Sequence, residues 1–328
     1  MSSEDGEHLK EALPPLAQAR LQSLRLSDGI ATLVLDVAGL DRLERDRLEV
    51  AVKDALGGQA GVSEVRVAMT ADKPQRKILA VGSGKGGVGK STLSANLAVA
   101  LARMGRKVGL VDADIYGPSQ PRLLGNEGEK PTASDKKLNP VPSPWGVPVL
   151  SMGHLAEPGQ AIAWRGPMAG NALSQLIDAH WGPIGSGGAE ILVVDLPPGT
   201  GDVQLTMLQR FKPTGALIVS TPQDLALMDA TRAMELFSKS GVPIVGVVEN
   251  MSGYACPHCG EVSDPFGAGG AEAAAAAKGH AFLGRIPLDL GIRLESDAGR
   301  PPAAGEGPQA EAFAAIARRV ATWLDNQG

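Results

Sequence analysis

The sequence is poor in aromatic residues and cysteine, carries no excess of positive charge, and contains no long apolar run. Aromatic residues make up 3% of its 328 residues, so a core has to be built mainly from Ala, Val, Leu and Ile. A net charge of −5 argues against nucleic-acid binding as the main task, because phosphate backbones need clustered cations. No run approaches the roughly 20 apolar residues that span a bilayer, and the acidic first residues lack the features of a secretory signal. We therefore expect a cytoplasmic protein with neither nucleic acid nor membrane as a partner.

From Lys77 onward, apolar segments alternate with amphipathic ones. This alternation predicts an α/β fold, a mostly parallel sheet with helices on both faces. The expected strands cover 78–82, 107–111, 148–151, 191–194, 216–219, 243–248 and 281–285. The expected helices cover 90–104, 168–179, 224–239, 270–278 and 308–325.

The first 72 residues predict a separate small α+β domain, with strands at 30–37 and 62–69, a helix at 41–56 between them and a leading helix. Residues 73–76 are polar and contain proline, which is typical of a linker. The domains expected are therefore 1–72 and 77–328.

The most specific motif is a glycine-rich run directly after the first strand of the larger domain. Residues 84–92 fit the phosphate-loop pattern G-x-x-x-x-G-K-[ST]. Such a loop surrounds a phosphate chain with backbone N–H groups, and glycines permit the positive φ angles and the close approach. Lys90 would neutralise the β- and γ-phosphates, and the Ser91 hydroxyl would bind Mg²⁺. The residues assigned to this ATP site are Gly84, Lys85, Gly86, Gly87, Val88, Gly89, Lys90, Ser91 and Thr92.

Three aspartates stand at the ends of predicted strands. Asp195 follows the apolar strand 191–194, the arrangement of a Walker B carboxylate that holds a water on Mg²⁺. Asp112 and Asp114 follow the strand 107–111, and side chains at i and i+2 of an extended chain point the same way. Asp112 would then aid the metal shell and Asp114 would orient the attacking water. The alternative is that these carboxylates only cap turns.

Lys85, directly after the first glycine, makes the loop resemble the deviant Walker A loop of the MinD/ParA/nitrogenase-iron-protein superfamily. Further strings at 112–119, 164–168, 195–202, 220–223 and 249–252 resemble the Mrp/ApbC family of ATP-dependent iron–sulfur cluster carriers, over about 77–326. This resemblance implies that Lys85 reaches across a homodimer to the partner's nucleotide and that Asn250 reads the adenine. The first 70 residues resemble, more weakly, a small iron–sulfur-assembly domain, but this copy is short and has no cysteine.

The chain's two cysteines, Cys256 and Cys259, stand at C-x-x-C spacing. Two thiolates can contact one metal centre, but a four-thiolate site needs a second pair, which a twofold dimer would supply. The residues alone leave open an iron–sulfur cluster, zinc, thiol–disulfide chemistry or an inert pair. The family resemblance implies a [4Fe–4S] cluster shared between the two subunits.

We therefore expect a slow ATPase, with Lys85, Lys90 and Asp114 as its catalytic residues, that transfers a cluster from an assembly scaffold to apo iron–sulfur proteins. One alternative is a ParA/MinD-type positioning ATPase whose output is binding to DNA or membrane. Another is an ATP-coupled redox protein that uses the same cluster. The last helix, 308–325, is expected to dock on the core rather than to form a membrane-binding tail.

Overall fold

The computed structural model describes residues 8–37, 40–70, 75–155, 166–256 and 258–327. Its contacts divide the chain into two units, Met1–Gln75 and Arg76–Gly328, and each unit is described by itself. The motif at Trp164 and Arg165 and the linker residues 73 and 74 lie outside the described residues.

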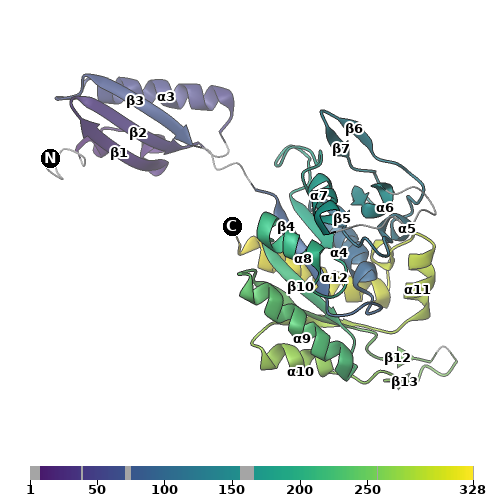
Figure 1. Ribbon diagram of the computed structural model, residues 1–328. Coiled ribbons are helices and arrows are strands. Elements are labelled where there is room, and N and C mark those ends of the chain that lie inside the picture. The colour runs from purple at the N-terminus through teal and green to yellow at the C-terminus, as the bar shows by residue number, and fades with distance from the viewer. Residues whose placement is uncertain (1–7, 38–39, 71–74, 156–165, 257, 328) are drawn as a thin grey trace. The chain divides into compact units, whose positions relative to one another are not determined.

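The larger unit is built on a seven-stranded sheet in which every neighbouring pair of strands is parallel. The strand order is β14-β11-β10-β4-β9-β5-β8, which places β4 at the centre. Figure 1 labels β4, β5 and β10 of this sheet. The strands are β4 (Lys77–Ser83), β5 (Val108–Asp112), β8 (Val149–Ser151), β9 (Ile191–Asp195), β10 (Gly215–Ser220), β11 (Ile244–Asn250) and β14 (Phe282–Ile286). The α/β fold class expected from the alternation of segments is confirmed.

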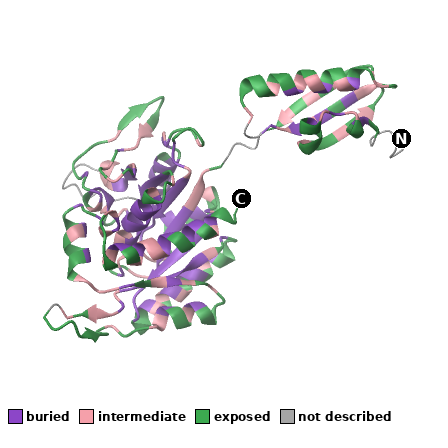
Figure 2. Ribbon diagram, turned by 180° about the vertical axis from the view of Figure 1, so that it is seen from behind, coloured by how far each residue is buried: buried purple, intermediate pink, exposed green. Residues whose placement is uncertain are grey.

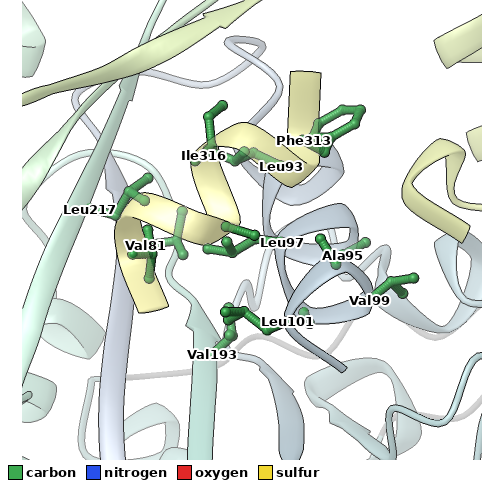
Figure 3. Close-up of a cluster of buried hydrophobic side chains, with 14 of the residues drawn as sticks. Val81, Leu93, Ala95, Leu97, Val99, Leu101, Val193, Leu217, Phe313 and Ile316 are labelled. Atoms are coloured by element: carbon green, nitrogen blue, oxygen red, sulfur yellow. The ribbon is translucent and has the colours of Figure 1, made fainter. Parts of the chain in front are cut away.

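Helices cover both faces of this sheet, because its strand residues point alternately to two separate apolar clusters. On one face, Val81 and Leu217 of the sheet pack with Leu97 of α4 and Ile316 of α12 (Figure 3). The opposite cluster joins the sheet to α7, α9 and α10. These helices are α4 (Lys90–Arg103), α7 (Gly166–Ile177), α9 (Asp224–Lys239), α10 (Gly270–Ala277) and α12 (Pro308–Asp325). Figure 2 shows the burial concentrated on the strands of this sheet.

The last helix docks on the core, as expected. Phe313, Ile316, Val320 and Leu324 recur at helical spacing and are all buried. Among the described residues, no helix combines the length and the apolar character that a membrane span requires.

The two edge strands of the sheet are both engaged by neighbouring groups. Val141 and Val149 exchange N–H···O bonds of 2.9 and 2.8 Å along β8, in an antiparallel bridge. At β14, the Arg319 guanidinium donates to the carbonyls of Phe282 (2.9 Å) and Leu283 (3.1 Å). Consecutive carbonyls of a strand point to opposite sides, so one of these two faces away from β11.

Several short elements were not expected from the sequence, because they are too brief to show periodicity. They are α5 (Gln120–Leu123), β6 (Thr132–Ser134), β7 (Lys137–Asn139), α6 (Met152–Leu155), α8 (Asp202–Thr206), a π-helical turn (Met207–Phe211), β12 (Tyr254–Ala255), β13 (Val262–Ser263), α11 (Leu290–Asp297) and a 3-10 turn (Pro302–Ala304). Several of them lie in loops that follow the carboxyl ends of the sheet strands, where α/β proteins place their ligands.

The small unit is a three-stranded sheet of order β1-β2-β3 covered by one long helix. Its elements are α2 (Pro15–Ala19), β1 (Leu21–Ser27), β2 (Ile30–Asp36), α3 (Arg42–Gly57) and β3 (Glu64–Thr70). The parallel pair β2–β3 with its crossover helix matches the expected β-α-β unit. Asp41 and Glu44 form a capping box that begins α3.

Strand β1, antiparallel to β2, was missed by the sequence analysis. The signal was present in the hairpin turn Asp28-Gly29, which has φ angles of 52° and 78°. An Asp-Gly pair between alternating apolar segments is a strong short-range indication of a β-hairpin.

Candidate functional site

The phosphate loop joins the central strand β4 to the 14-residue helix α4. Gly87 and Gly89 have φ angles of 78° and 83°, a region that side chains rarely tolerate. None of the backbone N–H groups of residues 86–92 donates a hydrogen bond to any residue that the structure describes. Unpaired donors at a helix N-terminus form an anion site, so this loop has the chemistry that a phosphate chain requires.

Two glycines of the loop are in places where no side chain fits. A Cβ on Gly84 would lie 2.0 Å from the backbone carbonyl carbon of Asp229 in α9, and one on Gly89 would lie 2.0 Å from Nδ2 of Asn250. The Asn250 amide donates to the Val88 carbonyl at 2.8 Å. Asn250, predicted to read the adenine, therefore lies at the end of β11 directly against the loop.

Lys90 lies in the middle of a cluster of carboxylates at the ends of β5 and β9. Its Nζ is 2.6 Å from Oδ1 of Asp195 and 3.8 Å from Oδ2 of Asp114. The Lys90 and Asp195 side chains are 7% and 0% exposed, so this ion pair is screened from water. Ser94 also donates to Oδ1 of Asp195, at 3.1 Å. The structure thus brings together Lys90, Asp114 and Asp195 as the sequence motifs predict, because β4, β9 and β5 are adjacent parallel strands.

Gln120 belongs to the same cluster and was not predicted. Its side-chain amide donates to Oδ2 of Asp195 (2.8 Å) and to the Ser91 carbonyl (3.0 Å). It is fully buried, and its Oε1 has no hydrogen-bond partner among the described residues. No motif spacing marks this residue, because α5, which positions it, is only one turn long.

Asp112 is the cross-strand partner of Asp195 and is fully buried. Its Oδ2 accepts hydrogen bonds from the N–H groups of Ser119 (2.9 Å) and Gln120 (3.1 Å) and from the Ser151 hydroxyl (2.9 Å). Burial, and then the charge of Asp195, raise the pKa of Asp112 to about 7. In this structure the carboxyl group holds the loop after β5 against β8; the role in the metal shell stays a prediction.

Asp114 and Lys85 both keep groups available for a ligand. Asp114 uses Oδ1 to accept from the N–H groups of Tyr116 (3.1 Å) and Gly117 (3.2 Å), which leaves Oδ2 on the side of Lys90. Lys85 is partly exposed, and its ammonium has no hydrogen-bond or ion-pair partner among the described residues. Both geometries are compatible with the predicted roles, water orientation for Asp114 and contact with a second subunit for Lys85.

The loop after Asp195 contacts the phosphate loop's own strand. The Gly199 N–H donates to the Ser83 carbonyl at 3.1 Å, and the side chain of Gln204 in α8 donates to the Pro197 carbonyl at 2.8 Å. A shift of this loop would therefore disturb hydrogen bonds at both the end of β4 and the start of α8.

The cysteines lie in the hairpin formed by β12 and β13, which follows β11 along the chain. Figure 1 labels the two strands of this hairpin. The Cys256 N–H donates to the Glu261 carbonyl (2.9 Å), and the Gly260 N–H donates to the Cys256 carbonyl (2.8 Å). Both thiols are free, with Cys259 exposed and Cys256 partly exposed. Hydrogen bonds from the backbone N–H groups of Cys259 and His258 lower the pKa of the Cys256 thiol. The shift favours the thiolate, which is the form of cysteine that binds metals and acts as a nucleophile.

The described residues of one chain do not complete a metal site by themselves. No group of three or more His, Cys, Asp or Glu side chains among them is placed to hold a metal ion. A pair of thiolates suits iron or zinc, and a closed site of either kind needs further ligands. The donor set thus fits half of a four-thiolate centre.

Comparisons with known proteins agree with this combination of sites. A family model described as ParA, NUBPL iron-transfer P-loop NTPase, matches residues 75–321. The chain is 44% identical over 290 residues to the iron-sulfur cluster carrier protein of Deinococcus radiodurans, covering 84% of this chain and 81% of that one. It is 42% identical over 278 residues to the iron-sulfur cluster transfer protein NUBPL of Dictyostelium discoideum, covering 83% and 84%. A solved structure of a nucleotide-binding protein from Archaeoglobus fulgidus in complex with ADP has 39% identity and a TM-score of 0.61, over 72% of this chain and 91% of that one.

Proposed function

The chain belongs to the family of NUBPL-type iron-transfer P-loop NTPases, and we propose from this premise that it hydrolyses ATP to carry a [4Fe–4S] cluster to apo-proteins. The observation that supports the proposal most is the position of two incomplete sites beyond the same, carboxyl-terminal edge of one parallel sheet. The phosphate loop follows β4 there, and the two-cysteine hairpin follows β11.

The nucleotide half of the proposal assigns a role to each charged group around the loop. The unpaired N–H groups of 86–92 would surround the phosphates, and the Ser91 hydroxyl with Asp195 would hold Mg²⁺. Lys90 now pairs with Asp195, so the phosphates would compete with that carboxylate for the ammonium group. Asp114 would orient the attacking water, and Lys85 would reach the nucleotide of a second subunit.

The cargo half of the proposal follows from the number of thiols. One chain supplies two, and a twofold homodimer would supply the four that a [4Fe–4S] cluster requires. Cluster-assembly scaffolds and apo iron–sulfur proteins would be the donors and recipients. The alternative of a membrane-positioning ATPase is disfavoured, because α12 buries its apolar face in the core rather than leaving it for lipid.

The direct test is anaerobic reconstitution of the full chain with iron and sulfide. We expect about four irons per dimer with the absorption of a [4Fe–4S] centre, and loss of both in Cys256→Ser and Cys259→Ser. Ser263→Ala on the same hairpin is the matched control and should load normally. Equal iron loading of the double cysteine variant, or stoichiometric zinc in the protein as isolated, would refute the cluster assignment.

A further inference from the structure

Glu249, near the end of β11, is a fully buried carboxylate surrounded by hydrogen-bond donors. Its Oε1 accepts from the Ser252 hydroxyl (2.8 Å), the Gly269 N–H (3.0 Å) and the Arg285 guanidinium (3.1 Å), and its Oε2 accepts from the Ala271 N–H (2.8 Å). Burial acts to raise the pKa of Glu249, but these hydrogen bonds outweigh burial and hold the pKa below its ordinary value. The group is therefore ionised at neutral pH.

These partners lie at both ends of the segment that carries the cysteines. Ser252 stands just before the hairpin, whereas Gly269 and Ala271 stand after it, at the N-terminus of α10. A single carboxylate thus closes the base of the segment 251–269, and it also caps the helix that follows. The hairpin within that segment has only two residues in each strand, so the anchoring at its base largely determines its position.

Asn250, the next residue along β11, contacts the phosphate loop instead. The amide of Asn250 donates to the Val88 carbonyl at 2.8 Å and lies where a Cβ on Gly89 would be. Successive side chains of a strand point to opposite faces, so Glu249 and Asn250 contact different elements although they are neighbours. One peptide unit therefore separates the residue that contacts the phosphate loop from the residue that closes the base of the segment 251–269.

We propose that Glu249 is a positioning residue that, together with Asn250, transmits the occupancy of the phosphate loop to the cysteine hairpin. Naming the hairpin's cargo as a cluster rests on the proposed function; the link itself does not. When the phosphate loop closes on a nucleotide, Asn250 is held more firmly. The hydrogen bonds of Glu249 to Ser252, Gly269 and Ala271 then hold the segment 251–269 more firmly as well.

Hydrogen–deuterium exchange of the full chain, without iron, measures this link directly. Mg·ADP is the probe, because it fills the loop without the γ-phosphate that we expect to close the dimer. In the wild-type protein, Mg·ADP should slow exchange in peptides covering 251–269 by about fivefold or more, the usual size of coupling between sites. In Glu249→Gln, the same peptides should exchange about tenfold faster without nucleotide, since each partner is a donor and an amide N–H cannot accept. The response to Mg·ADP should then vanish, although peptides covering 84–92 still become protected.

Glu272→Gln is the matched control. Glu272 is the exposed partner of the same Arg285, so its substitution removes a neighbouring charge but leaves every hydrogen bond of Glu249 in place. This variant should respond to Mg·ADP as the wild type does. If Glu249→Gln fails to fold, Ser252→Ala removes a single donor and should reduce the response by at least about half.

Two results would overturn the inference. One is that exchange in the wild-type segment 251–269 does not change when Mg·ADP is added. The other is that Glu249→Gln, with Mg·ADP bound to its phosphate loop, shows the same slowing of exchange as the wild type. Neither result affects the iron-loading test of Cys256 and Cys259. Conversely, failure of iron loading would remove the cluster as cargo and leave the exchange result standing.

Discussion

Replacing Lys90 by methionine should destabilise the larger unit as well as abolish nucleotide binding. The ammonium group is 2.6 Å from Asp195 and 3.8 Å from Asp114, in surroundings from which water is largely excluded. Two charges 4 Å apart attract by about 4 kcal/mol at the effective dielectric constant of protein sites. Methionine keeps the apolar part of the side chain and removes the ammonium group, so the loss comes mainly from the ion pair and its hydrogen bond to Asp195.

We expect Lys90→Met to lower the free energy of unfolding by about 3–5 kcal/mol near pH 8, the range for breaking a buried ion pair from one side. The double variant Lys90→Met/Asp195→Asn removes both charges and should recover at least about 2 kcal/mol.

The assay is urea unfolding followed by tryptophan fluorescence, without nucleotide. All four tryptophans lie in Arg76–Gly328, so the signal reports on the larger unit alone. A Lys90→Met variant within about 0.5 kcal/mol of wild type near pH 8 would refute the reasoning. A double variant whose loss equals the sum of the two single losses would do the same, because it would show that the pair does not interact.

Two further predictions concern the loop and the carboxyl group behind it. Gly84→Ala should lower the free energy of unfolding by about 1–3 kcal/mol and weaken ATP binding, because its Cβ would lie 2.0 Å from the backbone of Asp229. Gly86→Ala, whose Cβ would have its nearest neighbour at 3.9 Å, should lower it by less than about 1 kcal/mol. Equal losses for the two variants in urea unfolding would contradict this prediction. For Asp112, the pKa of about 7 against an ordinary 3.8 means that its contribution to stability is present below about pH 4 and is lost as the pH rises to about 7. Between about pH 4 and pH 7, the free energy of unfolding of the wild type should fall relative to that of Asp112→Asn by up to about 1.4 kcal/mol per pH unit. Stability curves of the two proteins that run parallel over this pH range would disprove the prediction.

Much of the larger unit could be predicted because its signals are local and strong. Each buried strand is a short apolar run, and the phosphate loop between 78–82 and 90–104 has a fixed spacing, so the fold class followed from alternation alone. The resemblance to iron–sulfur cluster carriers, which rested on Lys85 and several short strings, is confirmed by the family match over residues 75–321. The role of each site residue, and the nature of the small unit, stay predictions.

What could not be predicted depends on contacts between distant segments. Gln120 reaches Asp195 across 75 residues of sequence, and Glu249 reaches Ala271 across 22. Neither contact leaves a periodic pattern, because each arises only once parallel strands bring their carboxyl ends together. Strand β1 was missed for a different reason: the Asp28-Gly29 turn that marks it was overlooked.

The bonds at the two edge strands restrict how copies of this chain can join. An open strand edge is a template on which another chain can add a strand, and repeated addition leads to ribbons and fibres. Val141 occupies the outer side of β8, and Arg319 holds carbonyl groups of β14, so a visiting strand would have to displace both. A homodimer of the kind proposed above would therefore have to use surfaces of the larger unit other than the edges of its seven-stranded sheet.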